Sequence, residues 1–349
     1  ATKTARIVKA AEGKAVSDFG ARRAHNMDAA VYGARASYIG GAAGTATVLA
    51  GQMFGIPVSG TMAHSWVMYY KDEYEAFKHY AENYPDNTVL LVDTYDTIKS
   101  GIPNAIRVAR EVLEPMGKRL KGIRIDSGDL AYQSIKVRKM LDDAGLTDCK
   151  IIVSNSLDEH TISSLNMQKA RIDGYGVGER LITGASSDYS EDSISLLGAV
   201  YKIAAVEENG GFAPRIKVSG SVEKITNPGL KKVYRVYDQN GKAKADLIAK
   251  ADETIDMSQE FRFVDPDMPW RNLKFTHCTV RPLQEKIFEN GKLVYKLPTL
   301  NEIRAYVKKQ LDEEIWEEEQ RFVNPHKHYM DMTPDYYDMK MSLLNDSRA

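Results

Sequence analysis

Residues 122–156 read GIRIDSGDLAYQSIKVRKMLDDAGLTDCKIIVSNS, and their pattern sets the fold class. An apolar, β-prone run at Gly122–Ile125 is followed by a helical pattern over Leu130–Ala144 and by a second β-prone run at Lys150–Val153. Asp129 stands where the predicted helix needs an N-cap. Strand, helix and strand in this order are typical of a βα unit, in which the two strands are parallel.

The same alternation extends over the N-terminal half of the chain. Predicted strands begin at residues 57, 88, 122 and 150, so consecutive starts lie 31, 34 and 28 residues apart, the length of a βα unit. The predicted strands are Val16–Phe19, Pro57–Gly60, Thr88–Val92, Gly122–Ile125, Lys150–Val153 and Asp173–Val177, and the predicted helices are Met27–Tyr38, Ser65–Tyr80, Ile102–Leu113, Leu130–Ala144 and Asp158–Met167. This pattern predicts an α/β fold with a parallel sheet, either open or closed into a barrel.

The second half of the chain has a different, β-rich pattern. Asn-Gly pairs at 240–241 and 290–291 each separate two β-prone runs and predict hairpins. Apolar residues spaced three or four apart predict a long helix over Leu300–Phe322, and Thr333-Pro334 predicts the start of a final short helix. We therefore expect three parts: an α/β barrel with the functional mouth (1–190), a β-rich sandwich part (191–255), and a C-terminal hairpin and helices that pack on the core (256–349).

Composition excludes several classes of protein. The 349 residues carry 47 Lys and Arg against 48 Asp and Glu, a net charge of −1, without the basic excess typical of nucleic-acid binding. No apolar run is long enough to span a bilayer, so we expect no membrane contact. The two cysteines form no CxxC pair, which argues against a zinc ribbon or a disulfide framework and favours a cytoplasmic protein. His277-Cys278 lacks further ligands, and no metal site formed by the protein alone is predicted.

Polar or glycine-rich residues follow all six predicted strands. In chain order they are Arg22-Arg23; Thr61 and His64; Asp93 and Asp96; Arg124, Asp126 and Ser127; Ser154-Asn155-Ser156; and Gly174, Gly176 and Gly178. Any one of them could be an ordinary turn residue. Because the C-terminal ends of parallel strands meet at one edge, where α/β proteins bind ligands, the six groups together predict a single mouth.

Three of these groups allow more specific interpretations. His64 is either a capping or packing residue, or a nucleophile or general base. Arg124 and Asp126 lie two apart on a strand and so share a face, where their charges need a ligand or each other. The turn at 174–178 suits a phosphate, although it matches neither a P-loop nor a dinucleotide fingerprint. Such a mouth suits a substrate with anionic groups and sugar hydroxyls, and Mg²⁺ held mainly through phosphates.

Nine stretches, in fixed order, carry a resemblance to a known family. They are DFGARRAHNMDAA (18–30), YIGGAAGTATVLAG (38–51), VSGTMAHSWVM (58–68), VDTYDTIKSGI (92–102), GIRIDSGDL (122–130), GYGVGERLIT (174–183), LGAVYKIAAVE (197–207), IFENGKLVYKLPTLNEIRAYVKKQLDEEIWEE (287–318) and NPHKHYMDM (324–332). This set closely resembles nicotinate phosphoribosyltransferases. The resemblance implies an irregular, TIM-like βα barrel with parallel strands, joined to a β-rich sandwich part and a helical C-terminal region.

The resemblance also implies a reaction and its partners. Phosphoribose would pass from phosphoribosyl pyrophosphate to nicotinate, giving nicotinate mononucleotide and pyrophosphate in NAD biosynthesis. ATP would be a co-substrate that transiently phosphorylates a histidine, and Mg²⁺ would enter bound to substrate. The family forms homodimers with a shared active site. It also carries a further N-terminal segment with a TDLYQ-like motif, which we expect to supply sandwich strands and a tyrosine of the site from outside these 349 residues.

Roles transfer to this sequence only where its motifs match those of the family. His64 matches the phosphorylated histidine, and Asp93 and Asp126 match carboxylates around the ribose and pyrophosphate. Substrate-binding positions are Phe19 (pyridine ring), Arg22, Thr61 and Arg124 (nicotinate), Ser154, and Gly176, Gly178 and Thr183 (5′-phosphate).

Two positions bear on the choice of substrate. Glu179 departs from the family pattern beside the predicted phosphate turn, where an acidic side chain is unfavourable. Ala46 offers no acceptor for an amide and so favours nicotinate over nicotinamide. Specificity for nicotinamide or quinolinate, and an inactive fragment that acts as a scaffold, remain the alternatives.

Overall fold

The computed structural model describes residues 1–185, 199–220, 224–315 and 330–347. The chain forms two compact units, Ala1–Leu197 with Leu300–Val307 (unit 1) and Gly198–Thr299 with Lys308–Ala349 (unit 2). One sheet of unit 2 takes strands from both sides of residue 255. The three-part division at residues 190 and 255 stays a prediction.

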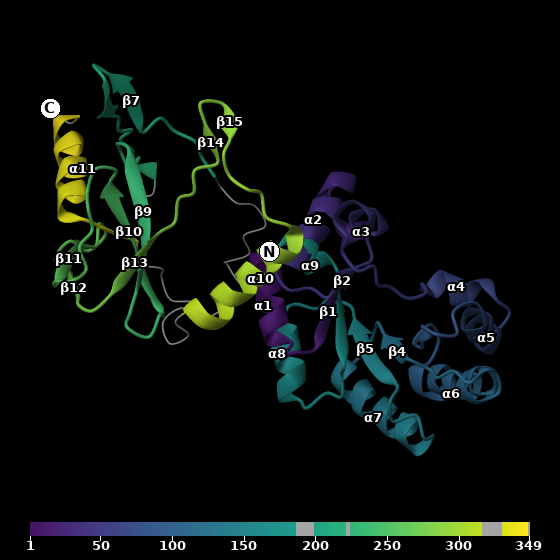
Figure 1. Ribbon diagram of the computed structural model, residues 1–349. Helices are drawn as coiled ribbons and strands as arrows, with labels where there is room; N and C mark the ends of the chain where they lie inside the picture. Colours follow the sequence, from purple (N-terminus) through teal and green to yellow (C-terminus); the bar gives the residue numbers. More distant parts are fainter. Residues whose placement is uncertain (186–198, 221–223, 316–329, 348–349) are drawn as a thin grey trace. The chain divides into compact units, whose positions relative to one another are not determined.

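A six-stranded parallel sheet forms the centre of unit 1 (Figure 1). Its order is β2-β1-β6-β5-β4-β3, and every neighbouring pair is parallel. The strands are β1 (Ala15–Asp18), β2 (Gly44–Thr45), β3 (Val89–Leu91), β4 (Gly122–Ile125), β5 (Lys150–Ser154) and β6 (Gly174–Val177). The predicted α/β class with parallel strands is therefore confirmed, and the expected irregular barrel takes the form of a six-stranded half-barrel sheet.

Helices alternate with these strands. They are α1 (Thr2–Ala10), α2 (Met27–Ile39), α3 (Val48–Phe54), α4 (His64–Tyr69), α5 (Glu73–Asn83), α6 (Ile102–Val108), α7 (Leu130–Asp143), α8 (Glu159–Met167) and α9 (Glu179–Thr183), with short turns of 3₁₀ or π geometry at Ala21–Arg23 (η1), Thr97–Gly101, Ala109–Leu113 and Glu114–Met116. Asp129 caps α7 as predicted, because its carboxylate accepts the backbone N–H of Tyr132. Asn26, Asp72 and Asp158 cap α2, α5 and α8 in the same way.

Two predicted elements differ from the structure. At 57–60 there is only an isolated bridge between Thr45 and Val58, since proline lacks the N–H that a ladder needs. The helix predicted over Ser65–Tyr80 is interrupted: Tyr70 is extended, and α5 begins afresh behind its own cap.

The strands of unit 1 are anchored by a continuous apolar core. Leu90, Ile123, Ile151 and Val153 from the sheet are fully buried, and Phe77 packs against them from α5. Full burial of one such side chain contributes about 1.5–3 kcal/mol. The core therefore holds the strand ends, and the side chains that follow them, in fixed positions.

Unit 2 is built around an antiparallel-rich sheet of order β12-β11-β16-β10-β9-β13. Its elements are β7 (Ala205–Glu208), β8 (Gly211–Pro214), β9 (Lys231–Tyr237), β10 (Ala243–Lys250), β11 (Phe261–Val264), β12 (Asn272–Phe275), β13 (Thr279–Pro282), β14 (Phe288–Glu289), β15 (Lys292–Leu293), β16 (Met330–Met332) and α11 (Pro334–Asp346). Both predicted hairpins are confirmed, as β9–β10 and β14–β15. Thr333 caps α11, as its sequence position predicts.

The long helix predicted over Leu300–Phe322 is shorter in the structure. It comprises α10 (Leu300–Lys309) and one π turn, Gln310–Glu314, and it ends where Ile315 turns to an extended conformation. The remainder of the predicted span lies outside the described residues. No helix in the described parts of the chain has both the length and the apolarity needed to cross a membrane.

Candidate functional site

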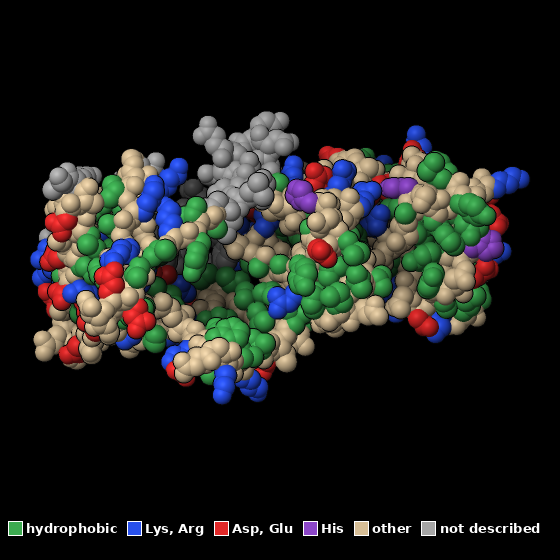
Figure 2. Space-filling model, turned by 90° about the horizontal axis from the view of Figure 1, so that it is seen from above, with side chains coloured by type: hydrophobic (Ala, Val, Ile, Leu, Met, Phe, Trp, Pro, Cys, Tyr) green, Lys and Arg blue, Asp and Glu red, His purple; other side chains and the backbone are tan. Residues whose placement is uncertain are grey.

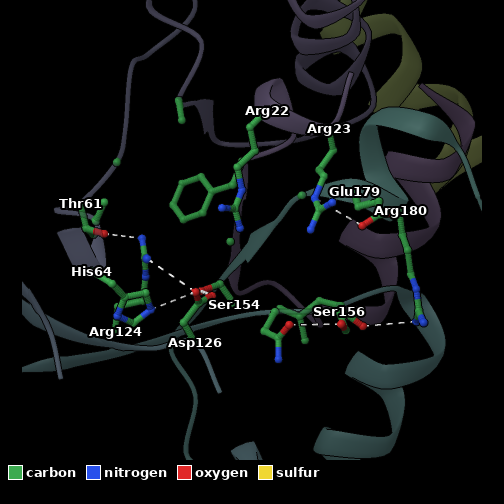
Figure 3. A pocket seen from close by; sticks show the side chains of 18 of the residues that line it. Arg22, Arg23, Thr61, His64, Arg124, Asp126, Ser154, Ser156, Glu179 and Arg180 are labelled. Atoms are coloured by element: carbon green, nitrogen blue, oxygen red, sulfur yellow. Dashed lines mark hydrogen bonds and ion pairs between the residues drawn. The ribbon is translucent and has the colours of Figure 1, made fainter. Parts of the chain in front are cut away.

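A cavity of about 830 Å³ opens at the C-terminal ends of the strands of unit 1 (Figure 3). All the residues to which the sequence assigns a role except Asp93 and Thr183 line it. Of the other strand-end residues, Asp96 and Ser127 line a neighbouring pocket with Asp93, and Gly174 lines neither. The lining residues are Phe19, Arg22, Arg23, Ala46, Gly60, Thr61, Met62, Ala63, His64, Ser65, Arg124, Asp126, Ser154, Asn155, Ser156, Leu157, Gly176, Gly178, Glu179, Arg180 and Ala185.

An aromatic ring and a buried cation form one wall. The Cζ of Arg124 lies 5.8 Å from the centroid of the Phe19 ring. Phe19 fits this place because Gly176 has no side chain: a Cβ there would come within 2.3 Å of the ring. Aromatic ring and guanidinium together offer a stacking face and a positive charge to a flat anion.

Arg124 is held in place but not fully paired. Its Nη1 donates to the hydroxyl of Thr61, and its Nη2 lies 3.9 Å from Oδ2 of Asp126. Its Nε is buried and has no hydrogen-bond partner among the described residues. Burial lowers the pKa of Arg124, although a guanidinium remains charged at any physiological pH. A buried donor of this kind is unfavourable unless a ligand accepts from it.

The turn η1 carries two further arginines, whose side chains point into the cavity side by side (Figure 3). Nε of Arg23 pairs with Glu179 at 3.5 Å, whereas Arg22 has no ion-pair or hydrogen-bond partner in the described part of the chain. Asp18 shapes the turn from beneath: it accepts from the N–H of Gly20 at 2.8 Å and from the hydroxyl of Thr45 at 2.7 Å. Burial raises the pKa of Asp18 despite these bonds.

His64 faces two carboxylates and one hydroxyl. Its Nε2 lies 3.5 Å from Oδ2 of Asp126 and 3.9 Å from Oδ1 of Asp93, and its Nδ1 lies 3.1 Å from Oγ1 of Thr94. Asp93 is thus placed beside His64, although it lines a neighbouring pocket instead of the main cavity. Ser154 donates to Oδ1 of Asp126, so the ends of β4 and β5 are joined at this point.

The loop after β5 contains site features that the sequence did not reveal. Asn155 and Ser156 both have positive φ, 86° and 51°, and such strained residues gather at functional sites. Arg180 holds this loop by donating to the carbonyl of Ser156 at 3.2 Å and to Oδ2 of fully buried Asp158 at 2.7 Å. Burial opposes ionisation of Asp158, but bonds from Thr161 and the charge of Arg180 outweigh it and lower the pKa.

Thr183 is not brought into the cavity. Its hydroxyl donates to the carbonyl of Glu179 within α9 at 2.7 Å and accepts from the N–H of Ala185. The predicted role of Thr183 at a 5′-phosphate therefore stays a prediction, whereas Gly176 and Gly178 do line the cavity. Glu179, the residue that departs from the family pattern, forms an ion pair with Arg23.

No group of three or more His, Cys, Asp or Glu side chains in the described residues is arranged to hold a metal ion. Asp93 and Asp126 are the carboxylates that lie within 4 Å of His64 among the described residues.

Comparison with known proteins agrees with this geometry. The model of the nicotinate phosphoribosyltransferase (NAPRTase) family matches residues 14–253, and that of the nicotinate phosphoribosyltransferase C-terminal domain matches residues 230–340. The chain belongs to the nicotinate phosphoribosyltransferase family. It is 47% identical over 352 residues to nicotinate phosphoribosyltransferase of Bacillus subtilis, covering all of this chain and 69% of that protein.

Two further relatives share less sequence identity with the chain. The chain is 34% identical to the Dictyostelium discoideum protein, covering 96% of this chain and 64% of that protein. Among solved structures, human nicotinic acid phosphoribosyltransferase matches with a TM-score of 0.79 at 26% identity, covering 98% of this chain and 73% of that one. The chain spans between 59 and 69% of the length of the first three curated relatives.

Proposed function

We propose that this chain carries the reaction centre for transfer of phosphoribose from phosphoribosyl pyrophosphate to nicotinate, with ATP as co-substrate. The products would be nicotinate mononucleotide and pyrophosphate, in NAD biosynthesis. One observation carries the proposal: Arg22, Arg124 and Phe19 share a single cavity with His64 and Asp126. Family membership supports the same reaction.

The nicotinate end of the cavity follows from its charge and shape. A pyridine ring can stack on Phe19, while its carboxylate accepts charge-assisted hydrogen bonds from guanidinium groups. Among the described residues, Arg22 has no ion-pair or hydrogen-bond partner and Nε of Arg124 is buried without one, so both have donors to offer. Ala46 also lines this cavity and presents only a methyl group, which supports a carboxylate ligand over an amide that would need an acceptor.

The phosphoribosyl end would need negative charge. Breaking the bond between C1 and pyrophosphate leaves positive charge on the ribose, which nearby carboxylates stabilise. Asp126 lines the cavity, and Oδ1 of Asp93 is buried without a hydrogen-bond partner among the described residues. These carboxylates are the groups that would meet a substrate-bound Mg²⁺, which when bound would neutralise the departing pyrophosphate.

His64 suits the ATP-coupled step because one of its imidazole nitrogens can act as a nucleophile. In that step a nitrogen lone pair would attack the γ-phosphorus, an N–P bond would form, and ADP would leave with the electrons of the broken P–O bond. With a side chain 39% exposed, the ring is reachable from the cavity. Asp126 and Asp93 would favour positive charge on the ring during this transfer.

We also propose that the chain acts as a homodimer with a shared site. Large apolar side chains are exposed on α2, α3 and α4 beside the mouth: Met27, Tyr32, Val48, Met53 and Met68 are each more than half exposed. Figure 2 shows hydrophobic side chains over broad areas of the face it presents, with basic side chains and histidines among them. Exposed apolar areas of this kind are typical of protein interfaces.

The proposal is tested by incubating the purified chain with nicotinate, phosphoribosyl pyrophosphate, ATP and Mg²⁺ and measuring the mononucleotide. Product formation that depends on all four supports it. No product at any protein concentration would favour an inactive scaffold. Parallel titrations with nicotinamide and quinolinate test the alternative substrates, and tight binding of either without nicotinate binding would overturn the assignment.

A further inference from the structure

We propose that Thr94 is a positioning residue that holds the His64 imidazole with its proton on Nε2. The hydroxyl of Thr94 is 3.1 Å from Nδ1 of His64, and it lies in the segment that directly follows β3. The contact joins residues 30 positions apart, so the sequence alone gave no sign of it. The expected effect on the rate of His64 phosphorylation rests on the proposed function, whereas the tautomer assignment does not.

The two sides of the ring differ in chemistry. On the Nε2 side stand two acceptors, Oδ2 of Asp126 and Oδ1 of Asp93, at 3.5 and 3.9 Å. Both carboxylates already accept hydrogen bonds on their other oxygen. Asp93 accepts from the backbone N–H of Asp126 at 2.9 Å and from the hydroxyl of Ser127, while Asp126 accepts from Ser154. Such bonds suit the ionised form, which can only accept.

The Nδ1 side completes the assignment. In a neutral imidazole one nitrogen carries the proton and the other accepts a hydrogen bond. The charge of the two carboxylates favours the proton on Nε2, which leaves the lone pair on Nδ1, where the Thr94 hydroxyl can donate to it. The Thr94 hydroxyl can also accept from Nδ1 when the ring is protonated, so it holds the ring in both charge states. The side chain of Asp93 is 2% exposed and that of Asp126 22%, so both carboxylates are largely shielded from bulk water.

Hydrogen bonds of the two residues before Thr94 fix its position relative to β4. Asp93, directly before it, is tied to the end of β4 by the N–H of Asp126, and Val92 donates its N–H to the carbonyl of Arg124 at 3.1 Å. Thr97, three residues on, is buried but makes no hydrogen bond to His64 in the described structure. A valine in place of Thr94 would keep the shape of the side chain and remove only the hydroxyl.

The test is ¹⁵N NMR of histidine-labelled protein without substrates, comparing the native chain with Thr94→Val, Thr94→Ser and Thr97→Val. The His64 signals are identified by their loss in His64→Gln. We expect an unprotonated Nδ1 in the native chain, a mixture of tautomers or a reversed one in Thr94→Val, and the native pattern in Thr94→Ser and Thr97→Val. A native Nδ1–H tautomer, or an unchanged pattern in Thr94→Val, would overturn the proposal.

A kinetic measurement separates this inference from the proposed function. Phosphorylation of His64 by ATP should differ from the native rate by about 10-fold or more in Thr94→Val, with rescue in Thr94→Ser, because a change of tautomer moves the lone pair from one ring nitrogen to the other. Nicotinate affinity should not change. The NMR spectra could show the expected tautomers while no variant, nor the native chain, is phosphorylated. That outcome would refute the ATP-coupled reaction and leave the role of Thr94 intact. Equal loss in Thr94→Val and Thr94→Ser would refute positioning through the hydroxyl.

Discussion

Replacing Arg22 with alanine removes a guanidinium that has no partner among the described residues and lines the proposed nicotinate end of the cavity. No existing ion pair is broken, so the change should act on ligand binding and leave the fold unaffected. A hydrogen bond to a charged group contributes about 1.5–3 kcal/mol. Because Arg22 is exposed and solvent screens its charge, we expect a value near the lower limit, about 1.5–2 kcal/mol, or a Kd for nicotinate weakened about 10- to 30-fold.

Isothermal titration with nicotinate measures this change directly. Arg23→Ala is the matched control, since Arg23 is the next residue of the same turn and lines the same cavity, but its guanidinium is paired with Glu179. Arg23→Ala should weaken nicotinate binding less than Arg22→Ala does. Thermal unfolding of both variants should remain close to that of the native chain. An unchanged Kd in Arg22→Ala, with normal unfolding, would remove Arg22 from the nicotinate site and refute the reasoning.

Three further predictions test other parts of the account. Gly176→Ala should displace the Phe19 ring, at a cost of about 1–3 kcal/mol in stability or in nicotinate affinity, and native values for both would contradict the packing described. Asp158→Ala should lower the free energy of unfolding by about 2–3 kcal/mol, because α8 loses its cap and Arg180 loses its partner. Chemical denaturation measures it, with Lys139→Ala, at an exposed ion pair, as the surface comparison. The raised pKa of Asp18 means that the folded state binds a proton at this group more readily than the unfolded state does. The contribution of Asp18 to the free energy of unfolding should therefore increase as pH falls from neutral through the raised pKa. Asp18→Asn should lose this pH dependence, and identical profiles of unfolding free energy against pH in both proteins would contradict it.

Local patterns were enough to predict much of the fold. The strand starts at residues 122 and 150 and the cap at Asp129 were correct because each depends on a few adjacent residues. Asn-Gly pairs located both hairpins for the same reason. The prediction of a single helix over Ser65–Tyr80 is wrong because the apolar spacing continues across the break at Tyr70. That continuous spacing conceals the start of a new helix.

The candidate site could be predicted only in part. Residues at or near strand ends, such as Arg22, Arg124 and Asp126, line one cavity as expected, because a parallel sheet gathers strand ends at one edge. Arg180 and Thr94 were missed because their roles depend on contacts with residues 22 and 30 positions away, at Asp158 and His64. Positive φ at non-glycine residues is likewise a property of the folded loop and has no sequence signal as strong as an Asn-Gly pair.

The central claim is that one cavity holds a charged pyridine beside a sugar phosphate. A crystal structure of the chain with nicotinate mononucleotide tests it most directly. The account predicts the pyridine ring against Phe19, its carboxylate within hydrogen-bond distance of Arg22 or Arg124, and the phosphate near Gly178. A mononucleotide bound elsewhere, or bound with its carboxylate away from both arginines, would contradict it.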